Sequence, residues 1–217
     1  MKEFMLTDKC ILVTGANGLI GREVADALSS AGANLMLLDV ASDDSLKIYA
    51  KRLSEKYSTK TKSYCANIAD VGQIGDVIDK IASDFGKIDV LINLAAIDAK
   101  FDVDLDNMPK TAFEDFPMDL WKKSIDVNVT GTFNITQQVI KKMLEQGFGN
   151  IINVASTYSL VSPNQNLYKF DEESEQLFKP VDYVVTKSVI PNFTRYLATF
   201  YGKKGIRVNT IVPHGVV

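Results

Sequence analysis

Tyr183 and Lys187 are the side chains of this sequence best suited to proton transfer. Residues four apart share one face of a helix, so the phenol and the ammonium would lie on the same side. A phenol ordinarily has a pKa of about 10, and work near neutral pH requires about 4 kcal/mol of stabilisation for the phenolate. A neighbouring ammonium supplies stabilisation of this kind. The same spacing also arises when a tyrosine packs over a lysine stem, so the pair needs support from other residues.

Two further polar residues precede the pair. Ser156 ends an apolar run, where its hydroxyl could hydrogen-bond a substrate carbonyl or alcohol, although serine at such a place is commonly a cap or turn residue. Asn128 lies in a helical pattern, where asparagine is a weak helix former. A buried amide there needs partners and is either a structural link or the holder of a water molecule. Taken alone, Asn128 is better interpreted as a structural link.

A glycine-rich turn, TGANGLIG at residues 14–21, follows the first apolar run and opens a helix. The first glycine can make a tight turn, the second lets the backbone approach a diphosphate, and the third allows close packing of helix on strand. The helix N-terminus offers free N–H groups and a partial positive charge. Such a turn can also be purely structural. If it is a phosphate site, the contacting residues are Gly15, Asn17, Gly18, Leu19, Ile20 and Gly21.

Asp39 indicates which dinucleotide would bind. It ends the second apolar run, where a carboxylate can accept hydrogen bonds from both ribose hydroxyls and would repel a 2′-phosphate. The alternative, that it caps the next helix, is weaker because Ser42 and Asp43 are better placed. The glycine turn contains no Arg or Lys that could bind a 2′-phosphate. Arg22, directly after the turn, is the one residue that favours NADP. The sequence therefore favours NAD.

These residues need a scaffold, and the apolar pattern predicts one. Short runs rich in Val and Ile alternate with segments whose apolar residues recur every three to four positions. This alternation predicts an α/β fold with a Rossmann-type doubly wound parallel sheet and helices on both faces. We find no linker or repeat, so residues 1–217 should form a single domain. The expected strands are residues 10–15, 33–39, 62–68, 87–95, 149–156 and 205–213.

Two long connections interrupt the alternation, an acidic one at residues 97–117 and a second one at residues 157–180. Both follow strands, and loops beyond the carboxyl ends of strands border the ligand crevice of such sheets. Within the second, the tract 162–180 interleaves aromatic and polar side chains, which suits a hydroxyl-rich ligand. We expect this tract to face the acidic loop over the substrate side of the nicotinamide. It could also be an idle insertion, because doubling a loop costs only about 0.6 kcal/mol.

Composition narrows the possible partners. The net charge is −3 and the sequence pI about 5.3, with basic residues scattered, so a nucleic-acid or membrane partner is not expected. Cys10 and Cys65 form no CxxC pair, which argues against a disulfide framework or a metal site. No apolar run approaches the about 20 residues of a membrane span. The sequence predicts a cytoplasmic protein acting on a small molecule.

Taken together, these motifs resemble the short-chain dehydrogenase/reductase family over nearly the whole chain. The resemblance implies that Tyr183 is the acid/base and that Lys187 lowers its pKa and holds the nicotinamide ribose. It also implies that Ser156 orients the substrate oxygen and that Asn128 anchors a proton-relay water. The motifs that carry it are TGxxGxxG, Asp39, Asn67-Ile68, Asn93, Asn128, Ser156, Tyr183-x-x-x-Lys187 and Pro213-x-Gly215.

The resemblance further implies an arrangement around the cofactor and between subunits. Asn67 and Ile68 would flank the adenine, and Asn93 and Ala95 would line the nucleoside. The turn formed by Pro213 and Gly215, with Tyr183 and Lys187, would face the nicotinamide end. The helices around residues 121–143 and 183–200 would pair across a two-fold axis, giving a homodimer or homotetramer.

Some features depart from the compact branch of that family. The turn TGANGLIG, the tetrapeptide NLAA and the 27 positions from Ser156 to Tyr183 resemble the extended, nucleotide-sugar branch, whereas GIRVNTIVPHG is of compact type. The mixture resembles dehydrogenases of flagellin glycan-modification pathways. His214 stands where glycine is usual, and the chain stops at Val217, before the expected substrate-closing loop and C-terminal strand.

The favoured interpretation is an NAD-dependent oxidoreductase that transfers a hydride between nicotinamide and a secondary alcohol or ketone of a polar, sugar-like substrate. One alternative is an NADP-dependent reductase of 3-oxoacyl thioesters, against which Asp39 argues. Another is a dinucleotide-binding sensor without turnover, which would not need a phenol beside an ammonium.

Overall fold

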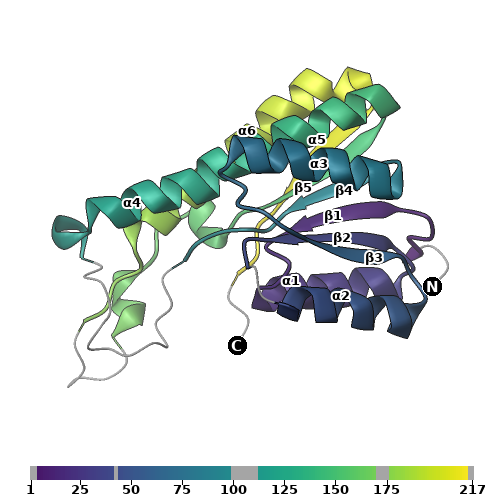
Figure 1. The fold of residues 1–217 in the computed structure, drawn as a ribbon. Helices are drawn as coiled ribbons and strands as arrows, with labels where there is room; N and C mark the ends of the chain where they lie inside the picture. Colours follow the sequence, from purple (N-terminus) through teal and green to yellow (C-terminus); the bar gives the residue numbers. More distant parts are fainter. Residues whose placement is uncertain (1–3, 42–43, 99–111, 170–175, 215–217) are drawn as a thin grey trace.

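A six-stranded parallel sheet forms the centre of the molecule, in the strand order β3-β2-β1-β4-β5-β6 (Figure 1). The computed structural model describes residues 4–41, 44–98, 112–169 and 176–214. The predicted doubly wound sheet is confirmed, and each expected run overlaps one strand, with β3 beginning one residue before its expected run. The strands are β1 Cys10–Thr14, β2 Asn34–Asp39, β3 Thr61–Cys65, β4 Val90–Asn93, β5 Gly149–Val154 and β6 Ile206–Ile211.

Helices cover both faces of this sheet, as the alternating pattern predicted. Helices α1 (Leu19–Ser30) and α2 (Asp44–Tyr57) lie below it in Figure 1. Helices α3 (Val71–Phe85), α5 (Thr132–Gln146) and α6 (Val181–Tyr201) lie above it.

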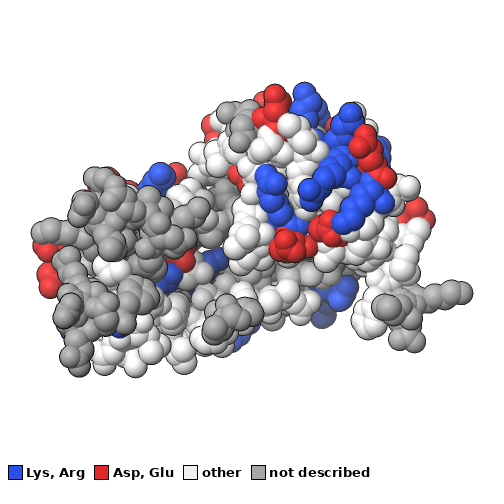
Figure 2. Space-filling model, turned by 90° about the horizontal axis from the view of Figure 1, so that it is seen from below, with Lys and Arg blue, Asp and Glu red and all other residues white. Residues whose placement is uncertain are grey.

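Two apolar cores result, because successive strand residues point to opposite faces. In β1, Ile11 and Val13 join the core under α1 and α2, while Leu12 joins the core with α3, α5 and α6. The outer face of α1 and α2 carries interspersed charges of both signs (Figure 2), including an ion pair of 3.1 Å between Lys56 and Asp26.

Helix α5 continues a longer helical rod. The rod begins with α4 (Met118–Ser124) and passes through the π-helical turn η4 (Ile125–Gly131). A π-helical turn inside an α-helix is uncommon and is often found at functional sites. Here it contains Asn128, one of the predicted site residues.

The second long connection extends beyond the sheet. It contains two short 3₁₀ turns, η5 (Thr157–Ser159) and η6 (Gln165–Tyr168), which lie below α4 in Figure 1. The predicted helix cap at Ser42 and Asp43, Gly215 and most of the acidic loop lie outside the described residues. Both cysteines are free, Cys10 buried and Cys65 exposed. Among the described helices, none has the length and apolar character that crossing a membrane demands.

Candidate active site

The glycine turn after β1 is shaped by close backbone contacts. Gly15 has a φ of 66°, which L side chains rarely adopt, and a Cβ there would lie 2.7 Å from Ala95 Cα. A Cβ at Gly21 would overlap the carbonyl oxygen of Gly15. At Gly18, by contrast, a Cβ would have only this oxygen nearby, at 3.4 Å. The first and third glycines are therefore required by the fold, while the second leaves an open approach to the backbone.

This open approach fits a dinucleotide diphosphate. Gly18 is the N-cap of α1 with no side-chain cap, and the first turn contains no acidic residue. Leu19 and Ile20, which begin the helix, are 85% and 57% exposed. The first N–H groups of an α-helix have no intrahelical partner, so here they are available to an anion.

Asp39 and Asn17 hold the turn together. The carboxylate of Asp39 accepts hydrogen bonds from the backbone N–H groups of Asn17 at 2.9 Å and Ala41 at 3.2 Å. Arg22 donates to the Asn17 side-chain oxygen at 2.6 Å, so this guanidinium is engaged within the turn. A carboxylate has about four acceptor positions. Asp39 can therefore stabilise the turn and still accept a ribose hydroxyl.

Asn67 and Ile68 follow β3 at the same edge. The Asn67 side-chain oxygen accepts the N–H of Ala69 at 3.0 Å, which forms a tight turn. The Ile68 side chain is buried, 5% exposed, and packs beside Gly131. It belongs to the core under α5. A ligand at this edge would meet the Ile68 backbone, and its contact with the adenine stays a prediction.

Asn93 is also directed inward. It is 5% exposed, and its amide nitrogen donates to Thr136 and to Asn153, both at 2.8 Å. Its side chain therefore joins β4 to β5 and α5, and a contact of this residue with the nucleoside stays a prediction. Ala95 lies nearer the glycine turn, and its N–H donates to the Thr14 hydroxyl at 3.1 Å.

The structure brings Ser156, Tyr183 and Lys187 together where β5 meets α6. Lys187 is 6% exposed, and its ammonium donates to the Val154 carbonyl at 2.9 Å. The same nitrogen lies 5.8 Å from the centre of the Tyr183 ring. The Ser156 hydroxyl interacts with the phenol and lowers the Tyr183 pKa. A hydroxyl, a phenol and an ammonium thus lie near one another.

The charges around Tyr183 oppose the implied pKa shift. Burial raises the pKa of this phenol above its ordinary value, and the Asp98 carboxylate raises it further, which outweighs the lowering by Ser156. Burial also lowers the pKa of Lys187 to about 8, partly offset by Asp98. Below this pKa Lys187 carries the positive charge that favours a phenolate. Because burial and Asp98 prevail at Tyr183, the implied lowering of its pKa by Lys187 stays a prediction.

Asn128 acts as the structural link that its sequence context favoured. Its side-chain oxygen accepts the N–H of Ile97 at 2.7 Å, and its nitrogen donates to the Ile97 carbonyl and to Thr186, both at 3.0 Å. Both hydrogens of the amide nitrogen are used. The side chain fixes the backbone after β4 to helix α6, and the relay water remains a prediction.

Pro213 follows β6 and approaches the same site. The N–H of Thr157, next to Ser156, donates to the Pro213 carbonyl at 3.0 Å. His214, which stands where the family usually has glycine, contacts the Thr157 hydroxyl through Nδ1 at 3.0 Å. The segment after β6 is therefore attached beside the catalytic candidates.

Two charged residues at the site were missed by the sequence reasoning. The Lys179 ammonium binds both oxygens of the Asp98 carboxylate, at 2.7 and 2.6 Å, and lies 4.1 Å from the Tyr183 ring centre. The one available signal was spacing, since a lysine stands four residues before Tyr183 as well as four after it. Lys179 precedes α6, so a helical interpretation would have misplaced it.

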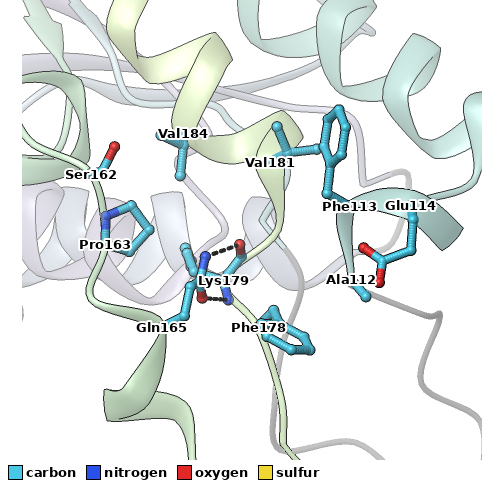
Figure 3. Close-up of a pocket in the computed structure, with 10 residues that line it drawn as sticks. All are labelled: Ala112, Phe113, Glu114, Ser162, Pro163, Gln165, Phe178, Lys179, Val181 and Val184. Carbon is cyan, nitrogen blue, oxygen red and sulfur yellow. Dashed lines mark hydrogen bonds between the residues drawn. The ribbon is translucent and has the colours of Figure 1, made fainter.

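A cavity of about 430 Å³ adjoins this site (Figure 3). Described residues of the tract 162–180 and of the end of the acidic connection line it, so these two segments face each other. Their expected place over the nicotinamide stays a prediction. Val181 and Val184 of α6 point into it, whereas Tyr183 and Ser156 are not among its lining residues. The remaining lining residues are Ala112, Phe113, Glu114, Ser162, Pro163, Gln165, Phe178 and Lys179.

Comparison with known proteins agrees with this geometry. Residues 9–169 match the sequence profile described as short chain dehydrogenase. The D-threitol dehydrogenase of Mycolicibacterium smegmatis is 29% identical over 97% of this chain and 71% of its own length. The NAD-dependent glycerol dehydrogenase of Listeria innocua is 30% identical over 98% of this chain and 72% of its own. An NAD⁺-bound xylitol dehydrogenase superposes with a TM-score of 0.82 at 28% identity, covering 97% of this chain and 72% of that one.

Proposed function

The chain belongs to the short-chain dehydrogenase family of oxidoreductases, and from this premise we propose that it uses NAD to interconvert a secondary alcohol and a ketone on a polar, hydroxyl-rich substrate. The observation that carries the proposal is the convergence of Ser156, Tyr183 and Lys187 beside β5. A sensor without turnover would have no use for a buried ammonium next to a phenol.

Each of these side chains has a distinct task in the proposed reaction. The bound nicotinamide would supply the hydride acceptor or donor. Ser156 would hydrogen-bond the substrate oxygen, and Tyr183 would take the hydroxyl proton during oxidation and return it during reduction. Lys187, held by the Val154 carbonyl, has further N–H groups for ribose hydroxyls and carries positive charge below its pKa of about 8. Asn128 would keep the backbone at Ile97 in place.

The preference for NAD rests on Asp39 and the helix N-terminus beside it. The carboxylate is fixed by the N–H of Asn17 at the entrance of the glycine turn, where a 2′-phosphate would meet its negative charge. Two of the similar proteins are named as NAD-dependent or NAD⁺-bound, which supports the proposal. Calorimetric titration with NADH and NADPH tests it, and equal affinity for both would overturn it.

The proposed substrate class follows from the polar side chains near the site and from the polyols named for similar proteins. A panel of polyols, sugar acids and nucleotide sugars, followed by NADH absorbance, would test it, with a 3-oxoacyl thioester as contrast. Turnover of the thioester alone would favour the alternative reductase. A role in flagellin glycan modification, the narrower expectation, requires a nucleotide sugar among the accepted substrates.

We also propose a homodimer or homotetramer in the cytoplasm. The outer faces of α5 and α6 expose large apolar side chains, among them Phe133 at 50%, Tyr196 at 61% and Phe200 at 52%. Phe133 lies 6.3 Å, between ring centres, from Phe193 of the neighbouring helix, so the two helices form one apolar surface. Light scattering at micromolar concentration would test this, and a monomer would contradict it.

A further inference from the structure

The ion pair between Lys179 and Asp98 is partly buried and lies beside the Tyr183 ring. The Lys179 side chain is 8% exposed, while that of Asp98 is 38% exposed. The ammonium contacts both carboxylate oxygens and lies 4.1 Å from the Tyr183 ring centre. A buried lysine is costly unless it is paired. Here the pair is placed against the proposed acid/base.

An amide side chain holds the backbone at or beside each member of the pair. Asp98 follows Ile97, whose N–H and carbonyl are both bound by the Asn128 side chain. On the other side, the Gln165 amide accepts the Lys179 N–H at 2.8 Å and donates to the Lys179 carbonyl at 3.3 Å. Figure 3 shows these two bonds as dashed lines. The Asn128 and Gln165 side chains thus fix the backbone on the two sides of the salt bridge.

Two ammonium groups, those of Lys179 and Lys187, therefore lie near the Tyr183 ring. Lys187 approaches from the same helix at 5.8 Å, and Lys179 approaches from the tract at 4.1 Å. Attraction between a cation and an aromatic face holds the ring in place without occupying its hydroxyl. The hydroxyl remains available to Ser156 and to a substrate.

We propose that Lys179 and Asp98 are positioning residues that hold the Tyr183 ring and set the charge around its hydroxyl, so that the tract 162–180 acts on the acid/base group itself. This rests on the proposed role of Tyr183 in proton transfer. The tract is then not an idle insertion, because it supplies the cation of the pair. Asp98 supplies the opposing charge from the loop after β4.

The two charges have opposite effects on the phenol. The Asp98 carboxylate raises the Tyr183 pKa by disfavouring the phenolate, whereas an ammonium beside the ring favours it. Other groups near the ring come from α6, from the turn after β5 and from η6. The charged and titratable groups there include Asp98, Tyr158, Tyr168, Lys179, Asp182 and Lys187, and the Ser156 hydroxyl interacts with the phenol.

Opposite effects permit a sharp test, because Asp98→Asn and Lys179→Met break the same ion pair. Fluorotyrosine is incorporated at the eight tyrosines, and the Tyr183 signal in the fluorine NMR spectrum is assigned with Tyr183→Phe. Its pKa is then measured by titration in each variant without cofactor or substrate. Exposed residues give matched controls: Lys169→Met in the tract and Asp119→Asn at the start of α4.

The expected result is a lower Tyr183 pKa in Asp98→Asn and a higher one in Lys179→Met, with Lys179→Arg close to the parent and no shift in either control. If the pair were only a link between two segments, both variants would shift the pKa in the same direction or leave it unchanged. Either of those outcomes would overturn the proposal.

A variant that fails to fold would not block the test. Asp98→Asn takes the carboxylate away from a buried ammonium, so it is the more vulnerable of the two. The double variant Asp98→Asn/Lys179→Met removes both charges of the ion pair, and it differs from Lys179→Met only at Asp98. Its Tyr183 pKa should be the lower of the two, and an equal or higher value would overturn the proposal.

This measurement is independent of the proposed reaction. If Tyr183→Phe retained full turnover, Tyr183 would not be the acid/base and the proposed function would fail, whatever the titrations showed. If Tyr183→Phe lost turnover while the titrations showed no opposed shifts, the proposed function would stand and the role of the pair would fail.

Discussion

The cofactor side and the substrate side of this molecule are built in different ways. On the cofactor side, the turn from β1 into α1 is one continuous stretch of eight residues, 14–21, closed by the Asp39 carboxylate. On the substrate side, Asp98 and Lys179 meet across 81 positions of sequence. The first side is formed mainly by one continuous stretch of chain, supported by Asp39 and Ala95, while side chains from two distant segments form the second. We expect changes on one side to leave the other largely unaffected.

The largest expected effect is on the substrate side alone. Tyr183→Phe should lower kcat by about 10²- to 10⁴-fold, because it removes the proton donor and acceptor. NAD affinity should stay within about twofold, since the glycine turn and Asp39 are untouched. Steady-state kinetics and calorimetry measure the two quantities.

Tyr196→Phe is the matched control for this variant, since Tyr196 lies on the same helix and is 61% exposed. It should behave like the parent chain. Full activity of Tyr183→Phe on a genuine substrate would refute the assignment of the acid/base.

A second effect concerns Lys187, which lies between the two sides. Burial lowers its pKa to about 8 from an ordinary value of 10.5, so at pH 7 the folded cofactor-free chain bears a cost of about 3 kcal/mol. Between about pH 8 and 10.5 the unfolded chain binds more protons at this residue than the folded one. The free energy of unfolding should therefore gain a rising contribution with pH in this window.

Lys187→Met should remove this rising contribution. Urea unfolding of the two proteins at several pH values measures the difference, without cofactor so that no bound ligand contributes. Lys169→Met, an exposed lysine, should keep the slope of the parent. The same slope in Lys187→Met and the parent would show that the ammonium is not desolvated.

A third change should affect the cofactor side alone. Asp39→Ala combined with Val40→Arg removes a carboxylate and adds a guanidinium at a residue that is 67% exposed. Hydrogen bonds to charged groups contribute about 1.5 to 3 kcal/mol, so the preference for NAD over NADP should fall by about 10- to 100-fold. Affinities for NADH and NADPH measured by fluorescence give the ratio.

Val40→Arg alone is the control, because it retains the Asp39 carboxylate. This single variant should keep most of the NAD preference. If the double variant preferred NADH over NADPH as strongly as the parent does, Asp39 would not be the residue that distinguishes the two cofactors.

The smallest expected effect tests the long-range link on the substrate side. Gln165→Ala removes two hydrogen bonds to the Lys179 backbone, at a net cost of about 1 kcal/mol each. We expect kcat/KM for the true substrate to fall by about tenfold with unchanged NAD affinity. Asn166→Ala, whose side chain is exposed in the same turn, should change neither.

The features that could be predicted from the sequence are those formed by residues close together in the chain. The strand and helix pattern, the glycine turn and the shared face of Tyr183 and Lys187 depend on residues close in sequence, so local periodicity and spacing were sufficient. The burial of the Asn93 and Ile68 side chains could not be predicted in this way, because it depends on which distant elements pack over them. For Asn128, the sequence left two possibilities open, and the partners at Ile97 and Thr186 support the structural link.

By itself, therefore, the sequence determined the parallel α/β fold, the place of the glycine turn and the order of the candidate site residues. Only the tertiary structure decided that Lys179 and Asp98 meet at Tyr183 and that the pKa of the phenol is raised. The physical reason is that Coulomb interactions and desolvation depend on distance and burial in space. Neither quantity can be read from spacing along the chain when the interacting groups come from different loops.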